Sequence, residues 1–298
     1  MIRHLNSAAQ PPERIVLLGA RGFIAAALRR AIEASGLNAI AIGSAAIDLT
    51  ATDAAAALVD RLRPTDAVIM LAALTPDKGR DSATLMANLA MMRSVCSALE
   101  QTGAAHLMYV SSDAVYGPTV TRVTEQTLPA PADLYGAMHL AREIMAAGLA
   151  RIPLGILRVT GVYGAEDPHN SYGPNRFRRM ARSEGRITVF GRGEETRDHV
   201  HVDDVARLAL ECLMWRSVGS LNVATGISTS FKQVARLVAS HFRDVIPIVD
   251  TPRATSVTHR HYDVTPLIKA FPSFRFVGLA EGVEVTCRLE QDGGEARG

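Results

Sequence analysis

The sequence predicts an α/β fold in which helices cover both faces of a doubly wound parallel sheet. Short apolar runs alternate with helical patterns along the first half of the chain. The runs are apolar throughout, which is typical of strands buried on both faces. A chain of 298 residues with 48% hydrophobic and 21% charged residues is also long and apolar enough to bury a large core.

The expected strands are apolar runs bounded by glycine, by proline or by a helical pattern. They lie at residues 14–18, 38–42, 66–73, 106–112 and 153–160. Apolar residues at helical spacing predict helices at residues 23–36, 53–64 and 83–103, and a further helix that begins near Leu134. Residues 200–215 are predicted to form a strand followed by a helix. After Gly164 the sequence becomes rich in turn residues and then mixes short elements, which indicates a smaller second lobe.

Charge and cysteine content exclude several classes of protein. A net charge of +2 gives no footprint for nucleic acid or for an anionic membrane surface. Cys96, Cys212 and Cys287 lack the paired spacing of a zinc site or a disulfide framework, so we expect no metal and a reducing cytoplasm. No run approaches the roughly 20 apolar residues that span a bilayer.

The stretch LLGARGFIAAAL (17–28) joins the first strand to the first helix and predicts a dinucleotide loop. Gly19 permits a tight turn, Gly22 lets the backbone approach a pyrophosphate, and Ala25 packs the helix closely on the strand. The second strand ends at Gly43 and Ser44 without the acid that holds an adenosine ribose. This absence, with Arg21 as a possible partner of a 2′-phosphate, favours NADP slightly over NAD, although Arg21 could equally be a solvated surface residue.

The order of further motifs carries a family resemblance. After the loop follow DLT (48–50), LAA (71–73), YVSSDAVYG (109–117), LYGAMH (134–139), LRVTGVYG (157–164) and RDHVHVDD (197–204). From about Arg14 to Glu284 the chain resembles the extended short-chain dehydrogenases/reductases, the family of nucleotide-sugar epimerases, dehydratases and reductases. The resemblance implies a Rossmann-type domain, a smaller C-terminal α/β substrate lobe, and an active site between them.

The resemblance implies these domain boundaries. Residues 1–13 form a loose N-terminal tail, 14–165 the dinucleotide-binding domain to which 198–222 return, 166–197 and 223–290 the substrate lobe, and 291–298 a C-terminal tail. The residues expected to bind cofactor are Gly19, Arg21, Gly22, Phe23, Ile24, Ser44, Asp48, Leu49, Leu71, Ala72, Ala73, Tyr135 and His139.

The implied catalytic pair is Ser112 and Tyr135, with His139 where the family has a lysine. Such a lysine holds a positive charge beside the phenol, whose pKa of about 10 must fall to about 7 for it to act as a base, a change of about 4 kcal/mol. His139 lies one helical turn after Tyr135, but imidazole titrates near pH 6.5 and tends to stay neutral when partly buried. The site could therefore work with weak activation, run chiefly as a reductase from protonated Tyr135, or be catalytically dead.

Asp113 is a further candidate acid. In the family's 4,6-dehydratases an acid pair follows the serine or threonine, whereas here the pair reads Asp113–Ala114, which makes dehydration improbable. Asp113 could protonate substrate, or it could only cap local backbone groups.

Seven residues are candidates for substrate binding. Phe190 would lie near the nucleotide base and Arg197 near the diphosphate, and Ser112 would polarise the sugar carbonyl. The full set is Asn88, Ser112, Asn175, Arg176, Phe190, Arg197 and Arg260. Structural roles, such as a bond from Asn88 to nearby backbone or Phe190 in a core, compete with these assignments.

Two enzymatic functions and one binding function follow from the resemblance. The first is a nucleotide-sugar epimerase that oxidises and reduces C4 with tightly held NAD, and the second is a 4-keto-nucleotide-sugar reductase that uses NADPH. The third is a cofactor sensor without activity. A homodimer is possible through the Ala- and Met-rich helix at 83–100, although this helix could simply be core.

Overall fold

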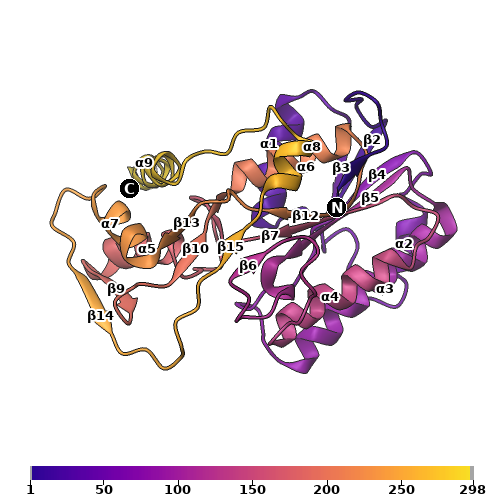
Figure 1. Ribbon diagram of the computed structural model, residues 1–298. Helices are drawn as coiled ribbons and strands as arrows, with labels where there is room; N and C mark the ends of the chain where they lie inside the picture. Colours follow the sequence, from indigo (N-terminus) through magenta and orange to yellow (C-terminus); the bar gives the residue numbers. More distant parts are fainter. Residues whose placement is uncertain (1, 296–298) are drawn as a thin grey trace.

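A seven-stranded sheet is the centre of the fold in the computed structural model, which describes residues 2–295 (Figure 1). Its strands lie in the order β1-β12-β7-β5-β4-β2-β3, and all pairs except β1–β12 are parallel. The strands are β1 (Arg3–His4), β12 (Ser217–Val223), β7 (Leu154–Val159), β5 (His106–Ser112), β4 (Asp66–Met70), β2 (Arg14–Leu18) and β3 (Ala39–Ile42). The predicted doubly wound α/β fold is confirmed.

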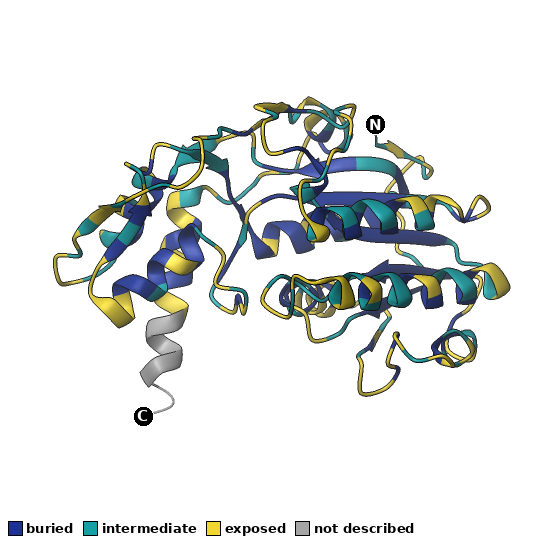
Figure 2. Cartoon of the chain, turned by 90° about the horizontal axis from the view of Figure 1, so that it is seen from below, coloured by how far each residue is buried: buried dark blue, intermediate teal, exposed yellow. Residues whose placement is uncertain are grey.

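Helices cover both faces of this sheet, as the apolar strands predicted. Within β2, Ile15 and Leu17 join the core under α1 (Phe23–Ala34) and α6 (Val202–Met214), while Val16 and Leu18 join the core on the other face. That second core lies under α2 (Ala54–Val59), α3 (Ser82–Thr102) and α4 (Leu134–Ala147). Figure 2 shows the buried strands between the half-buried helices.

The winding of the sheet reverses between β2 and β4. The chain passes from β2 through α1 to β3 on one side, and later strands add on the other side of β2. The turn at Gly19 and the segment after Met70 therefore meet at the carboxyl ends of neighbouring strands. Ligands of doubly wound sheets bind in the crevice at such a switch point.

A second group of elements packs around its own core beyond β7. It contains α5 (Pro174–Glu184), β9 (Ile187–Phe190), α7 (Phe231–Ala239), β14 (Ile248–Thr251) and α9 (Leu279–Glu295). Phe177, Val189 and Val234 are completely buried in this core. The remaining short elements are η1 (Asp113–Val115), β6 (Arg122–Val123), β8 (Val162–Tyr163), β10 (Thr196–Asp198), β11 (Val200–His201), β13 (Ser228–Ser230), β15 (His261–Tyr262) and α8 (Thr265–Ala270).

The predicted loose N-terminal tail is held to the sheet at Arg3 and His4. Arg3 and His4 pair antiparallel with β12, and the His4 ring nitrogens lie 2.8 Å from Ser217 Oγ and 2.9 Å from Ala270 O. The ring also stacks on Trp215 at 4.9 Å, so aromatic and polar contacts hold a segment that lacks apolar periodicity. At the other end, α9 continues to Glu295, and residues 296–298 lie outside the described part.

Two predicted elements end earlier in the structure than their sequence patterns suggest. The strand expected at 66–73 ends at Met70, because the amides of Leu71 and Ala72 both turn to donate to Leu18 O. The helix expected at 53–64 ends at Val59, well before Pro64. Within residues 2–295, no helix is long and apolar enough to cross a membrane.

Candidate functional site

Ser112 and Tyr135 line one cavity at the carboxyl ends of the strands. Ser112 is the last residue of β5, and Tyr135 lies in the first turn of α4, which begins after Asp133 because that carboxylate accepts a bond of 2.8 Å from the Gly136 amide. The cavity has a volume of about 340 Å³, and Gly22, Leu71 and His139 also line it. The catalytic pair and the glycine loop predicted from the sequence therefore share one space.

The Tyr135 phenol is protonated at neutral pH in this environment. Burial raises its pKa to about 12, while a side-chain hydrogen bond with Ser112 works in the opposite direction. Of the charged groups that act on the phenol, Asp113 and Asp133 raise the pKa and Arg142 lowers it. A proton donor is thus in place, whereas a base at pH 7 requires further activation.

His139 is buried, with 4% of its surface exposed, and it is neutral at physiological pH. Burial and the nearby charge of Arg142 lower the pKa of the imidazole to about 3. Its ring lies edge-on to Tyr135, with 4.7 Å between ring centroids, and its Nδ1 is 2.7 Å from the Tyr109 hydroxyl. His139 therefore has the expected position beside Tyr135 but does not supply the charge of a lysine.

The glycine loop adopts the tight turn that its sequence predicts. Gly19 has φ of +104°, and a Cβ there would lie 2.5 Å from the Ala72 amide nitrogen. Gly22 precedes α1, which has no side-chain cap and no acidic residue in its first turn. A helix N-terminus of this kind attracts an anion. Phe23 and Ile24, the next two residues, line the cavity that contains Tyr135.

A second hollow of about 210 Å³ extends from the glycine turn towards the ends of β3 and β4. Arg21 donates to Ser44 Oγ at 2.9 Å on the exposed rim. Asp48 accepts hydrogen bonds from the amide and hydroxyl of Thr50, which lower the pKa of this carboxyl. The predicted cofactor residues that line this hollow are Gly19, Arg21, Gly22, Ser44, Asp48, Leu49, Leu71, Ala72 and Ala73.

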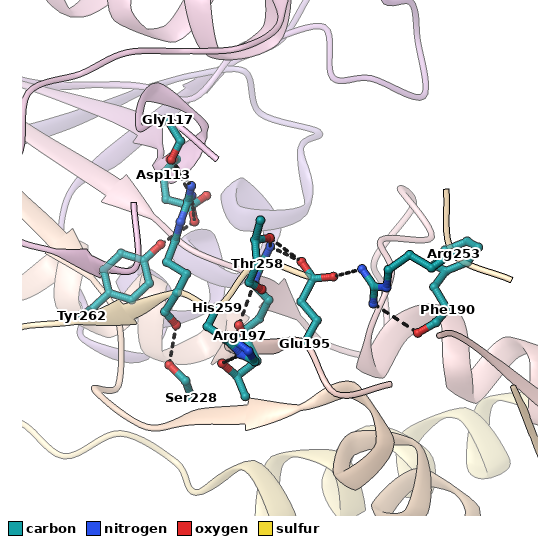
Figure 3. Close-up of polar contacts among 12 residues, drawn as sticks. Asp113, Gly117, Phe190, Glu195, Arg197, Ser228, Arg253, Thr258, His259 and Tyr262 are labelled. Atoms are coloured by element: carbon teal, nitrogen blue, oxygen red, sulfur yellow. Dashed lines mark hydrogen bonds and ion pairs between the residues drawn. The ribbon is translucent and has the colours of Figure 1, made fainter. Parts of the chain in front are cut away.

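Asp113 connects the end of β5 to the second group of elements. Its Oδ2 accepts a hydrogen bond from the Tyr262 hydroxyl at 2.5 Å (Figure 3). The same oxygen accepts from Thr160 Oγ1 at 3.1 Å and from Arg260 Nη1 at 3.3 Å. Arg260 also donates to the carbonyls of Asp113 and Gly117. The candidate acid is therefore a junction between segments far apart in the sequence, and the sequence reasoning did not single out Tyr262.

Glu195 accepts from two arginines at the opposite end of the same network. It pairs with Arg197, and its other oxygen accepts from Arg253 at 2.5 Å (Figure 3). Arg197 also donates to Thr258 O at 2.7 Å, and Arg253 donates to Phe190 O at 3.1 Å. One carboxylate thus faces two guanidinium groups, which leaves a positive charge near Phe190. Arg253, in a proline-flanked segment without a motif, gave no signal in the sequence.

The remaining substrate candidates differ in what they can contact. Phe190 is 46% exposed and packs on Tyr172, and Arg176 is exposed. Asn88 and Asn175 are each 1% exposed, and both amides bond backbone groups. Asn88 exchanges hydrogen bonds with Leu74 N and O, while Asn175 joins Gly164 N to Val162 O. Their amides therefore hold loops that form the walls of the site, although Asn88 also lines a small hollow with Tyr135.

The described residues contain no group of three or more His, Cys, Asp or Glu side chains that could hold a metal ion. The chemistry that this arrangement can support is proton transfer by Tyr135, with Ser112 as a hydrogen-bonding partner, next to a strand–turn–helix unit suited to a pyrophosphate.

Comparisons with known proteins show the family and the fold of this chain. The model of the NAD dependent epimerase/dehydratase family matches residues 15–224. A dTDP-L-rhamnose 4-epimerase of Burkholderia thailandensis is 36% identical over 126 residues, which are 40% of this chain and 35%, about a third, of that curated relative.

Solved structures resemble almost the whole chain. MoeE5, solved in complex with UDP-glucose and NAD, is 26% identical with a TM-score of 0.79, over 94% of this chain and 99% of that one. A UDP-glucose 4-epimerase of Thermotoga maritima has a TM-score of 0.81 at 22% identity, over 94% of this chain and 99% of its own, which shows a shared fold.

Proposed function

The chain belongs to the NAD-dependent epimerase/dehydratase family, and from this premise we propose that it is a nucleotide-sugar oxidoreductase that transfers a hydride at C4 of the sugar. The observation that carries the proposal is the single cavity shared by Ser112, Tyr135 and Gly22 of the dinucleotide loop. Hydride transfer at a carbinol carbon needs an acid/base, a hydrogen bond to the carbonyl oxygen and a dinucleotide within reach of one another.

Tyr135 is the proposed acid/base and Ser112 the proposed donor to the sugar oxygen. In the reductive direction Tyr135 begins protonated, as its raised pKa favours, and gives its proton to the oxygen at the reacting carbon. In the oxidative direction it takes that proton back. A bound nicotinamide accepts or supplies the hydride. The Asp113 carboxylate already accepts hydrogen bonds from three side chains, so we assign it a structural role in the site rather than a role in proton transfer.

The cofactor is held by the turn after β2 and the N-terminus of α1. The uncapped helix and the absence of an acid in its first turn fit a pyrophosphate. NAD is the cofactor of the family and of the MoeE5 complex. We propose that this chain also accepts NADP, because Arg21 and Ser44 form a donor pair at the end of β3, where a carboxylate would repel a 2′-phosphate.

The sugar nucleotide is proposed to lie between Tyr135 and the cluster of Glu195, Arg197 and Arg253. The exposed ring of Phe190 would cover the base, and the diphosphate would take the place of Glu195 as partner of one or both guanidinium groups. MoeE5 binds UDP-glucose, and the curated relative is named for a dTDP sugar. The proposed substrate is therefore a nucleoside-diphosphate sugar.

Epimerisation with retained NAD is the first candidate reaction and reduction of a 4-keto sugar with NADPH the second. The names of the similar proteins favour the first, and the protonated phenol with the Arg21–Ser44 pair favours the second. Absorbance of a dinucleotide that stays with the protein through gel filtration would identify an epimerase-type site. Tighter binding of added NADPH than of NADH, with turnover of 4-keto sugars only, would identify the reductase.

The same experiment tests the whole proposal with a panel of nucleotide-diphosphate sugars and free cofactor. A protein that binds dinucleotide, yet turns over no sugar as wild type or as His139→Lys, is a cofactor sensor. A protein that binds no dinucleotide refutes the proposed function altogether.

A further inference from the structure

Two residues that follow Tyr135 along one face of α4 contact Tyr109 in a strand of the sheet. His139 lies one turn after Tyr135, and Arg142 lies nearly two turns after it. Both are buried, with 4% and 0% of their surface exposed. Between them stands Tyr109 of β5, which is 1% exposed. Three polar side chains thus meet behind the wall of the cavity that contains Tyr135.

Arg142 supplies a fixed positive charge to this group. Its guanidinium carbon lies 5.2 Å from the centroid of the Tyr109 ring, and its Nη2 donates to Ala72 O at 2.8 Å. No carboxylate forms an ion pair with Arg142 among the residues that the structure describes. An arginine side chain stays protonated in proteins, so this charge persists when the imidazole beside it is neutral.

The hydrogen-bond partners determine which imidazole nitrogen carries the proton. Burial raises the pKa of the Tyr109 phenol, but the Arg142 guanidinium lies over the ring and its positive charge acts to lower that pKa, which makes the hydroxyl a stronger donor. The hydroxyl lies 2.7 Å from His139 Nδ1, so we assign its hydrogen to that contact. A neutral imidazole that accepts at Nδ1 carries its hydrogen on Nε2.

The Nε2 atom of His139 is buried and has no hydrogen-bond partner in the structure. Leaving a buried donor unpaired is costly, which makes an unpaired donor beside a cavity a sign of an absent ligand. His139 lines the cavity together with Gly22, Leu71 and Tyr135. His139 therefore lines the same cavity as the proposed acid/base and the proposed dinucleotide loop.

On the basis of the function proposed above, we propose that Arg142, Tyr109 and His139 act together in place of a lysine. Arg142 provides the positive charge, Tyr109 passes its polarisation to the imidazole, and His139 donates from Nε2 to a hydroxyl of the cofactor's nicotinamide ribose. The lysine's two roles, charge and hydrogen bond, are thereby divided between two residues joined by a third. Arg142 and Tyr109 are positioning residues, and His139 is the residue that contacts the cofactor.

The first test uses the ligand-free protein and requires no activity. Nitrogen-15 NMR of the histidine side chains, assigned with His139→Asn, is expected to show His139 neutral at pH 7 with its proton on Nε2. Tyr109→Phe removes the donor to Nδ1 with little change of volume and is expected to mix the two tautomers. A proton on Nδ1 in the wild type would overturn the proposal.

The second test measures cofactor binding and the pH dependence of sugar oxidation. Tyr109→Phe and Arg142→Met are each expected to weaken dinucleotide binding about tenfold. Arg142→Met should also move the alkaline rise of oxidation by about one pH unit to higher pH, because Arg142 is the cation that acts on Tyr135 while Asp113 and Asp133 oppose it. Both variants are first checked by thermal unfolding.

Tyr163→Phe is the matched control, because Tyr163 is 1% exposed and its hydroxyl has no hydrogen-bond partner. It should leave the dinucleotide Kd and the pH profile unchanged. If folded Tyr109→Phe protein binds the dinucleotide as tightly as the wild type does, the proposed joint role of Arg142, Tyr109 and His139 is wrong, while the proposed function stands. If the wild-type protein binds neither NAD nor NADP, the proposed function is wrong, and so is the proposed role of these three residues in cofactor binding.

Discussion

The two glycines of the dinucleotide loop are expected to fail in different ways when each is changed to alanine. Gly19 has φ of +104°, and an added Cβ would lie 2.5 Å from the nitrogen and 2.7 Å from the Cα of Ala72. A side chain at positive φ costs about 1–2 kcal/mol. Crowding against backbone adds about 1–3 kcal/mol. Gly19→Ala should therefore lower the free energy of unfolding by about 2–5 kcal/mol.

Gly22→Ala is the matched partner of this variant. Gly22 has φ of −69° and ψ of 157°, and the atom nearest to an added Cβ is Gly19 O at 3.6 Å. Alanine fits this backbone, so the free energy of unfolding should stay within about 1 kcal/mol of the wild type. The methyl group would instead stand where the pyrophosphate is proposed to approach. Dinucleotide binding should weaken at least about tenfold.

Urea unfolding and fluorescence titration with NADH and NADPH separate the two effects. With a urea m value of about 3 kcal/mol/M, the expected loss in Gly19→Ala corresponds to a fall in urea midpoint of about 0.7 M or more. A Gly19→Ala protein as stable as the wild type would refute the close approach of Ala72. Unchanged dinucleotide affinity in Gly22→Ala would refute the placement of the cofactor at this turn.

Three further outcomes are expected from titrating groups and from the serine. Because burial raises the pKa of Tyr135 to about 12, oxidation of the sugar should increase from pH 6 to pH 8 and beyond, and His139→Lys should move this rise to lower pH; a flat pH–rate profile would contradict the assignment. Ser112→Ala should lower kcat by about 100-fold or more with little change in KM for the sugar, measured by steady-state kinetics, if Ser112 donates to the reacting oxygen. Burial lowers the pKa of His106 to about 4, below the value of about 6.5 in the unfolded chain, so the unfolded state binds the proton first and stability falls as the pH drops through this window. Between pH 7 and pH 4.5, the free energy of unfolding of His106→Gln, measured with urea, should fall by about 2 kcal/mol less than that of the wild type. An equal fall in both proteins would show that His106 does not cause the loss of stability.

Local patterns predicted those parts of the fold that local forces determine. The strands at 14–18 and 106–112 have the predicted bounds because their apolar runs end at a glycine turn and at a polar serine. The proximity of Ser112 and Tyr135 was predictable, because the end of one strand faces the start of the helix that follows it. The antiparallel pairing of Arg3 and His4 was not predicted. A strand of two residues, held partly by the stacking of His4 on Trp215, is too short to show an alternation of apolar and polar residues.

The parts of the site that the sequence did not reveal depend on contacts between distant residues. Arg142 lies seven residues after Tyr135, a spacing that repeats on one face of a helix and could have drawn attention to it. Its proposed role depends on the contact with Tyr109, which comes from strand β5. Arg253 and Tyr262 are brought to Glu195 and Asp113 by the fold of the last third of the chain. No sequence spacing encodes such a pairing.

The bond from Tyr262 to Asp113 makes the residue next to Ser112 depend on a strand that is synthesised much later. The side chains of Arg260 and Tyr262 come from a segment nearly 150 positions downstream, beyond the 15–224 stretch that the family model matches. A ribosome that has released only that stretch has already produced the serine, the phenol and the glycine turn. The contacts around Asp113 in the proposed active site are thus completed only near the end of translation. A shortened chain would keep the sheet and leave Asp113 without two of its partners.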